Sequence, residues 1–325
     1  MANATNTLAG IVQMNDMNLA DYDITDLLQD APMVAQLVAI GASQGGTVHK
    51  YLKQTVAAGA EFRDVNTGVA NAASQDELVT VTCKFLDGSF HRDVAIASGY
   101  KGGAGAYMAK ETRRAIKSLF QGLEKQILQG TEADADGFTG MPGYSFVDSV
   151  YDGMVVDAGG AGGRSVWLVR STEEDVAIVA GNDGVLDFMF DEAMIQKIVT
   201  NVSTGAGYNA YNANLGGWYA TQFGSKYSLG RIANLDGTAT NTLEDDLLSE
   251  AISKFPAARG PSFLVMDRTL NQELQASRTA TNPTGAPAPF PTEAHGIPIV
   301  LTDQLGVSES QLTTTTTTTT TTTGG

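Results

Sequence analysis

The segment from residue 102 to residue 129 constrains the fold most, because it predicts one unusually long helix. Apolar residues recur at helical spacing along one side: Met108, Ile116, Leu119, Phe120, Leu123 and Ile127. Charged residues occupy the other side: Lys110, Glu111, Arg113, Arg114, Lys117, Glu124 and Lys125. At 1.5 Å per residue the helix spans roughly 40 Å, and helices in ordinary domains are much shorter. The pattern therefore predicts a rigid beam that ends at Gly130.

Four residues of the charged side form a basic face, namely Lys110, Arg113, Arg114 and Lys117. With Lys125 they give the helix five positive charges against two glutamates. Three interpretations stay open. The face is a solvated surface with ion pairs between successive turns, a seat for a loop of a neighbouring subunit, or a loose contact with phosphates.

The first 42 residues predict an arm followed by a short helix. Residues 1–29 are polar, Asn-rich and acidic, so they cannot bury a core of their own. They predict an extended arm that orders against a partner, and a frayed terminus is the alternative. The sequence Asp30-Ala31-Pro32 is typical of a helix start, and the apolar residues that follow predict an amphipathic helix over residues 33–40.

Residues 43–98 predict a long hairpin. Strand-forming residues occur over 47–56 and again over 78–85, where apolar residues alternate with a period of two. The polar tip between them is roughly twenty residues long, more than a compact domain usually places between two strands. An exposed hairpin of this length predicts an interaction element.

The remainder predicts further strands and then an α/β unit. A glycine-rich acidic connection runs to residue 163, and strands are expected at 165–170, 176–180, 186–190 and within 218–235. From residue 238 a helix capped by Thr242, a strand at 263–266, a helix capped by Asp267 and a strand at 296–301 alternate. Residues 313–325 are a low-complexity threonine tail.

No residue set predicts catalysis, a metal site or a cofactor. His49, His91 and His295 are far apart and lack metal-type spacing, and no nucleophile elbow or phosphate-binding loop is present. Cys83 is the single cysteine, which excludes an intramolecular disulfide, and its strand pattern predicts a buried, inert thiol. The acidic run at 132–137 lacks the later spacing of a calcium loop.

Charge and hydropathy limit the partners. The formal net charge is −16, whereas a sequence-specific nucleic-acid reader normally shows a basic footprint. An acidic surface suits a container wall that must not hold packed nucleic acid tightly, and ordinary solubility explains the charge equally well. A secretory signal and a membrane-length apolar run are both missing, which predicts a cytoplasm-like compartment and no membrane partner.

The order of arm, hairpin, beam helix, sheet-rich segment and α/β unit resembles the Hong Kong 97-type major capsid fold of tailed bacteriophages, which encapsulins share. Three stretches resemble one capsid branch: 61–68, 165–170 and 263–269, the last leading to 296–300. The resemblance covers roughly residues 30–305. It implies an α+β fold with an N-terminal arm, an E-loop hairpin, a P-domain with a spine helix and sheet, and an A-domain.

In these terms we expect six segments. They are the arm and short helix (1–42), the E-loop (43–98), the P-domain with its spine helix (99–163), a sheet-rich segment of the P-domain and A-domain (164–237), the A-domain (238–312) and the tail (313–325). The family often places long P-domain strands after the A-domain unit, but this chain nearly ends there. We therefore expect strands within 165–235 to supply that sheet.

The resemblance implies a self-assembling subunit, not an enzyme, of the icosahedral virion shell. It would form hexamers and pentamers around double-stranded DNA without sequence-specific contact, and assemble in the host cytoplasm. Scaffold, portal and decoration proteins are possible further partners. We expect the E-loop to contact adjacent subunits through Glu61, Phe62, Arg63, Asp64 and Asn66. The alternatives are an encapsulin-like nanocompartment shell and, in a different class, an enzyme or a secreted β-rich adhesin.

Overall fold

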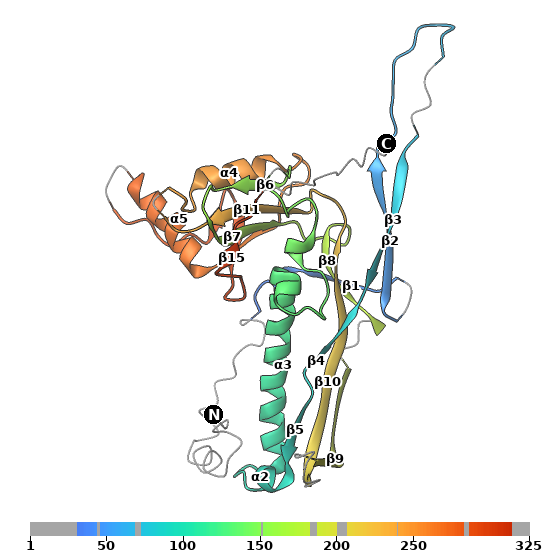
Figure 1. Ribbon diagram of the computed structural model, residues 1–325, viewed down its shortest axis with the longest axis vertical. Coiled ribbons are helices and arrows are strands. Elements are labelled where there is room, and N and C mark those ends of the chain that lie inside the picture. The colour runs from blue at the N-terminus through green and yellow to red at the C-terminus, as the bar shows by residue number, and fades with distance from the viewer. Residues whose placement is uncertain are drawn as a thin grey trace, which may run out of the picture.

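The computed structural model describes residues 31–43, 46–68, 73–150, 152–182, 187–199, 207–238, 240–282 and 286–313. Within 187–199 it describes the backbone. The expected arm at 1–30, the start of the strand expected at 186 and the threonine tail from 314 lie outside the described residues. Figure 1 shows an upright helix beside a long sheet, a second sheet covered by helices above it, and a hairpin that projects away.

The upright helix is α3 (Gly103–Gln129), and it confirms the predicted beam. It ends where Gly130 takes a positive φ of 59°, a conformation that favours glycine. The short helix α2 (Val94–Ser98) precedes it, capped by the carboxylate of Asp93. The 3₁₀ turns η5 (Gly130–Glu132) and η6 (Met141–Gly143) follow it.

A six-stranded sheet lies alongside α3. Its strands are β1 (Val38–Gly41), β4 (Lys84–Asp87), β5 (Phe90–Asp93), β8 (Val176–Ala180), β9 (Asp187–Val199) and β10 (Gly207–Phe223). Strand β10 is the centre, since β4, β5, β8 and β9 all pair antiparallel with it. Ala213 of β10 packs in a cluster with Tyr107 and Met108 of α3, so the helix and the sheet share an apolar core.

The predicted helix over 33–40 is wrong. The chain forms a single 3₁₀ turn, η4 (Val34–Gln36), and then strand β1, which pairs in parallel with β8. The backbone N–H groups of Met33 and Val34 donate to the carboxylate of Glu124 instead of to a helical turn. A short apolar run fits a strand or a helix equally well, and here the free edge of β8 decided between them.

The second sheet has seven strands and forms the α/β unit. They are β6 (Val155–Asp157), β7 (Gly162–Val169), β11 (Leu229–Leu235), β12 (Phe263–Met266), β13 (Glu293–Ala294), β14 (Ile297–Leu301) and β15 (Glu309–Ser310). Strands β7, β11 and β12 are almost wholly buried, with Trp167 at 0% exposure. The predicted strands at 263–266 and 296–301 are confirmed within a residue.

Two helices accompany this sheet, α4 (Asp245–Ser253) and α5 (Arg268–Ala280). Asp267 caps α5 as predicted, since its carboxylate accepts from the backbone N–H of Leu270 at 2.7 Å. The predicted cap of α4 at Thr242 is wrong. The helix starts at Asp245, and Glu244 takes the cap position without a side-chain hydrogen bond.

The hairpin consists of β2 (Val48–Val56) and β3 (Gln75–Thr82), which form a separate two-stranded sheet. The described residues of the tip between them have no regular structure. At the base of the hairpin, the Tyr51 hydroxyl donates to the carbonyl oxygen of Phe223 at 2.8 Å. His49 is buried there, with its Nε2 2.7 Å from the Gln222 amide oxygen. The base is therefore fixed while the rest projects (Figure 1).

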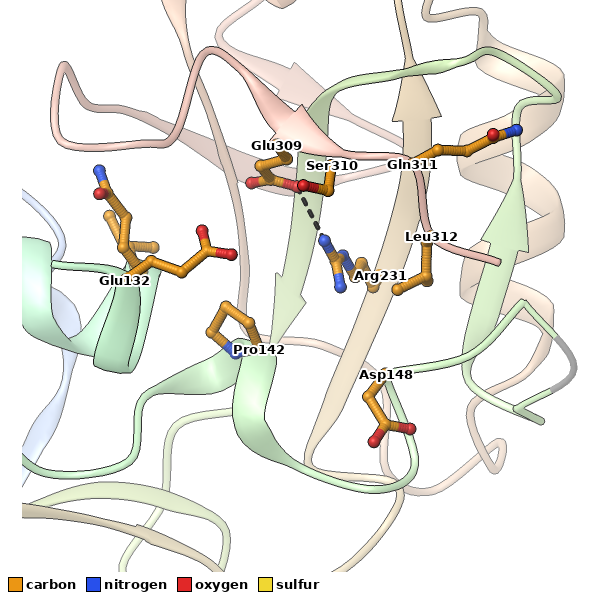
Figure 2. Close-up of a pocket in the computed structure, with 10 residues that line it drawn as sticks. Glu132, Pro142, Asp148, Arg231, Glu309, Ser310, Gln311 and Leu312 are labelled. Atoms are coloured by element: carbon orange, nitrogen blue, oxygen red, sulfur yellow. Dashed lines mark hydrogen bonds and ion pairs between the residues drawn. The ribbon is translucent and has the colours of Figure 1, made fainter. Parts of the chain in front are cut away.

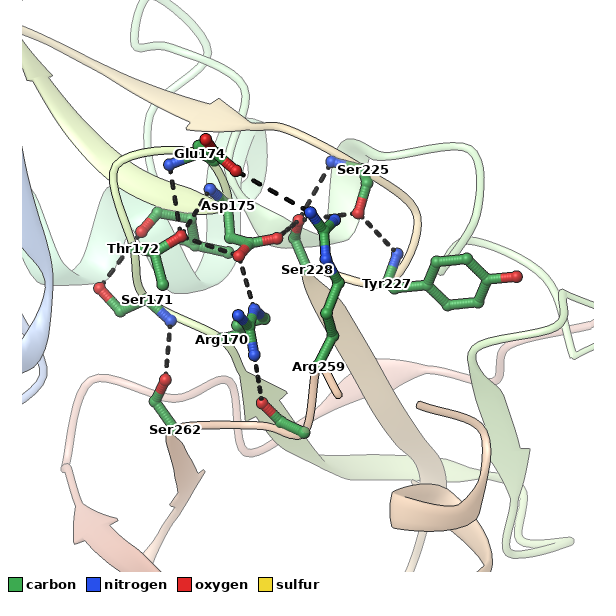
Figure 3. Close-up of polar contacts among 12 residues, drawn as sticks. Arg170, Ser171, Thr172, Glu174, Asp175, Ser225, Tyr227, Ser228, Arg259 and Ser262 are labelled. Carbon is green, nitrogen blue, oxygen red and sulfur yellow. Dashed lines mark hydrogen bonds and ion pairs between the residues drawn. The ribbon is translucent and has the colours of Figure 1, made fainter. Parts of the chain in front are cut away.

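Segment 164–237 contributes strands to both sheets, so the chain passes between the sheets twice. One polar cluster joins these two connecting segments. The chain passes from β7 to β8 through 170–175 and returns from β10 to β11 through 224–228. At the meeting point the buried carboxylate of Asp175 accepts from Arg170 Nε at 2.6 Å, Thr172 Oγ1 at 2.8 Å and Ser228 Oγ at 2.8 Å (Figure 3). We call these four residues the junction cluster.

The junction cluster holds a charged carboxylate in the interior. Burial alone would raise the pKa of Asp175, but hydrogen bonds from Thr172, Ser228 and Arg170 together lower it below its usual value. The backbones of the two connecting segments are also in close contact, because a Cβ on Gly224 would lie 1.7 Å from the carbonyl oxygen of Glu174. The relative position of the two sheets therefore depends on a tightly packed polar contact.

Candidate functional site

In the described part of the chain, exposed apolar side chains are concentrated on the projecting hairpin. In the described part of the chain nine large hydrophobic residues are exposed, and five of them belong to the hairpin: Leu52, Val56, Phe62, Val65 and Leu78. A concentration of this kind on one element marks an interaction surface.

The strands of the hairpin cannot bury this surface by themselves. Leu52 and Leu78 are direct cross-strand partners, yet they are 70% and 59% exposed. A lone two-stranded ribbon is marginally stable in water and needs another apolar surface against it. The described residues of this chain leave that face open, so the geometry suits a covering surface from another molecule.

The tip residues predicted as contacts are all exposed, and hydrogen bonds between Arg63, Asp64 and Thr67 form a turn among them. The Arg63 guanidinium donates to the carbonyl oxygen of Thr67 at 2.9 Å, and the Asp64 carbonyl oxygen accepts from the Thr67 hydroxyl at 2.8 Å. Asn66 adopts the left-handed conformation that such a turn requires. Glu61 and Phe62 directly precede this turn, and the Phe62 ring is fully exposed.

The predicted basic face of α3 is present. The prediction that Glu111 and Glu124 share the solvent-exposed side with it is wrong, because both are buried. Arg113 and Arg114 are exposed, and Lys110 and Lys117 are half-buried. Glu111 turns inward instead, where its carboxylate contacts Arg92 at 2.5 Å and Arg114 at 2.9 Å. This bridge ties α3 to β5, and helical spacing alone gives no signal of it.

Glu124 is the second glutamate of α3 that the structure buries. Its carboxylate accepts from the backbone N–H of Met33 at 2.9 Å and from the hydroxyl of Thr302, the residue after β14. Burial raises the pKa of Glu124, while these hydrogen bonds oppose the shift. Glu124 thus joins the start of the described chain, the beam helix and the α/β unit.

A pH dependence follows from Glu124. Because the folded-state pKa of Glu124 is raised above the ordinary glutamate value of 4.5, its contribution to stability is fully present below that pH and is lost as the pH rises through the folded pKa. As the pH rises through this range, we expect the free energy of unfolding of Glu124→Gln to increase relative to that of the natural protein. Unfolding free energies of both chains, measured by urea denaturation from pH 4 to pH 8, check it, and a difference independent of pH would contradict it.

A small pocket of about 190 Å³ lies beside the C-terminal strand β15 (Figure 2). Its arginine is already engaged, since Arg231 is 5% exposed, contacts the Glu309 carboxylate at 2.8 Å and donates to the Ser165 hydroxyl at 3.0 Å. Leu312 is bound through its backbone to the Asn234 side chain. The pocket therefore serves to fasten the C-terminal segment to the sheet.

The structure also places the single cysteine and the three histidines considered in the sequence analysis. Cys83 is buried as predicted, and burial raises the pKa of its thiol. His49 lies on β2, His91 on β5, and His295 in the turn between β13 and β14. Among the described residues, no group of three histidine, cysteine or acidic side chains could hold a metal ion. No helix in that part of the chain is long and apolar enough to cross a membrane.

Comparison with known proteins decides the family. The family model for the major capsid protein GP7 matches residues 16–313. This chain belongs to the GP7 major capsid protein family. Among curated protein sequences, none matches this chain.

Solved structures support the fold of this GP7 family member. A chain of bacteriophage Epsilon15 is 17% identical with a TM-score of 0.63, over 96% of this chain and 98% of that one. A chain of the bacteriophage JBD30 capsid is 11% identical with a TM-score of 0.54, over 92% and 99%. The predicted α+β fold of Hong Kong 97 type is confirmed. The chain is a major capsid protein that forms the phage head shell.

Proposed function

We propose that this GP7 family subunit assembles into hexamers and pentamers that close around double-stranded DNA. The exposed hairpin carries the proposal, because its apolar face and preformed tip need a partner surface, and copies of the same chain supply one at every position of a shell. The net charge of −16 suits a wall that makes no sequence-specific contact with the packaged DNA.

The E-loop contact is proposed to run through Glu61, Phe62, Arg63, Asp64 and Asn66. Phe62 supplies the apolar anchor, and the flanking charges orient the tip against an adjacent subunit. The basic face of α3 is one candidate seat. Because Arg114 also bridges to Glu111, exchanging Arg113 alone tests that seat more cleanly than exchanging both arginines.

The division of labour within the subunit follows the two sheets. We propose that α3 and the six-stranded sheet form the P-domain, and that the seven-stranded sheet with α4 and α5 forms the A-domain. Strands β8, β9 and β10 then supply the P-domain sheet, while β7 and β11 belong to the A-domain. In this division residue 164 lies inside β7 and residue 237 lies just beyond the end of β11, so both expected boundaries fall within the A-domain.

Further partners belong to the same proposal. The JBD30 capsid, to which this chain is similar, is decorated with minor capsid protein trimers, and a decoration protein is proposed here as well. We also propose scaffold and portal proteins as partners, assembly in the host cytoplasm, and a purely structural, non-enzymatic role.

Negative-stain electron microscopy of the purified full chain tests the proposal. Closed polyhedral shells or ring-shaped capsomers are the expected result. Shells isolated from infected cells should contain double-stranded DNA. Shells filled with a protein cargo would favour the nanocompartment instead, and a stable monomer under all salt conditions, with a scaffold co-expressed, would contradict shell assembly.

We expect no covalent crosslink through the E-loop. One variant of the capsid fold joins subunits by Lys–Asn isopeptide bonds in this loop, but the present chain has no lysine between Lys53 and Lys84. Boiled and reduced shells should therefore run as a single band at the mass of the 34.0 kDa chain on a denaturing gel. A ladder at dimer and higher masses would contradict the expectation.

A further inference from the structure

The solvent face of α3 presents only positive charges from the helix itself. Both of its glutamates point inward, with Glu111 5% and Glu124 0% exposed. Arg113, Arg114 and Lys125 are exposed. An exclusively positive face is unusual in a protein whose net charge is −16. It arises because the two glutamates are buried, which the sequence pattern does not reveal.

These charges form one line along the helix, which we call the cationic stripe: Lys110, Arg113, Arg114, Lys117 and Lys125. The first four stand at positions i, i+3, i+4 and i+7, which share one helix face. From Lys110 to Lys125 the stripe covers 15 residues, or roughly 22 Å at 1.5 Å per residue. A ligand for the stripe should therefore be an extended polyanion.

The chain itself supplies an acidic segment in its first 30 residues. Residues 1–30 contain five aspartates, at 16, 21, 23, 26 and 30, and no lysine or arginine. The described chain begins immediately after them with Ala31, which is buried. Two residues later the Met33 N–H donates to Glu124, which precedes Lys125 of the stripe. The acidic segment is thus tethered at one end of the cationic stripe.

We propose that the acidic segment of residues 1–30 docks along the cationic stripe of α3 in the same chain. Its reach is sufficient. Asp21 lies 12 residues before Met33, which corresponds to roughly 40 Å in extended form, whereas the stripe is about 22 Å long. Tethering at Glu124 keeps the local concentration of the segment high, so several weak ion pairs suffice to hold it. The docked segment would shield the one cationic face of the helix from other polyanions.

Hydrogen exchange of the full, unassembled chain tests the docking, with residues 1–30 followed by mass spectrometry. At about 20 mM salt we expect these residues to exchange roughly tenfold more slowly in the natural chain than in Arg113→Glu/Lys125→Glu. At about 500 mM salt the difference should disappear, because screening acts within a few ångströms there. Arg114 is left intact, since it also bridges to Glu111.

Two further variants make the test specific. Adding Asp21→Lys and Asp26→Lys to the stripe variant should restore the slow exchange. Lys84→Glu/Arg268→Glu reverses two exposed charges elsewhere and should leave it unchanged. Equal exchange in the natural chain and the stripe variant would overturn the proposal, as would protection that vanishes on dilution, which points to a neighbouring copy.

In the unassembled chain, nucleic acid is the competing occupant of the stripe. If the stripe variant loses binding to a short DNA duplex, measured by fluorescence anisotropy, while exchange of residues 1–30 is unaltered, the stripe is a phosphate surface and the proposal fails. The exchange experiment does not require shells. Failure of the docking is therefore distinct from failure of assembly, which electron microscopy reports separately.

Discussion

Replacing Phe62 and Val65 with aspartate should abolish closed shells while leaving the subunit folded. Both side chains are exposed in the subunit, so the substitution removes nothing from the described core. If each is buried against a neighbour, losing the pair removes about 3–6 kcal/mol per contact, and an inserted carboxylate adds a desolvation cost. Since 1.4 kcal/mol corresponds to a factor of ten, the subunit contact should weaken at least 100-fold.

The matched control uses the same chemistry at another place. Phe290 and Val307 are 59% and 60% exposed and lie outside the hairpin, so Phe290→Asp/Val307→Asp introduces the same charges. Electron microscopy and size-exclusion chromatography should show shells for the control and only small species for the hairpin variant, with equal circular dichroism. Shells from the hairpin variant would refute the E-loop contact, and loss of shells in both would show that the effect is not specific to the hairpin.

Asp175→Ala should lower the free energy of unfolding by about 3 kcal/mol. Removing one partner of a buried ion pair leaves the other charge uncompensated, which typically costs 3–5 kcal/mol. Here Arg170, Thr172 and Ser228 all lose their acceptor. The lost hydrogen bonds include the one between the two segments that connect the sheets, 170–175 and 224–228.

The pH dependence of this variant provides a second reading. Because the folded-state pKa of Asp175 is lowered from 3.8, its contribution is present above that pH and disappears as the pH falls through the folded pKa. The stability difference between Asp175→Ala and the natural chain should therefore shrink in acid. Asp303→Ala, at an exposed aspartate, should change stability by less than about 0.5 kcal/mol. Urea denaturation of unassembled chains measures both, and equal effects at the two sites would contradict the role of the junction cluster.

The sequence predicted well the elements whose signal is local. The beam helix has 27 residues of unbroken periodicity, and Asp267 caps α5 through its own neighbours. The hairpin was also predicted, because two runs of strand-forming residues flank a long polar stretch. The expected contact residues of its tip come from the resemblance of residues 61–68 to capsid proteins, and they remain predictions until assembly is measured.

Long-range contacts explain what the sequence analysis misjudged. Residues 33–40 have an apolar pattern that fits a helix, but the Glu124 carboxylate and the edge of β8, both distant in sequence, give their backbone other partners. The two glutamates of α3 fit a solvated face by spacing, and only the positions of Arg92 and Thr302 make their burial possible.

By itself, then, the sequence determined the local elements, their order along the chain and the absence of a catalytic residue pattern, because periodicity, caps and composition act over a few residues. The tertiary structure alone decided which sheet each strand joins, that Glu111 and Glu124 lie inside, and that Leu52 and Leu78 face outward together. Each of these depends on hydrogen bonds and apolar contacts between segments far apart in the chain, and such pairings leave no trace in the spacing of either partner.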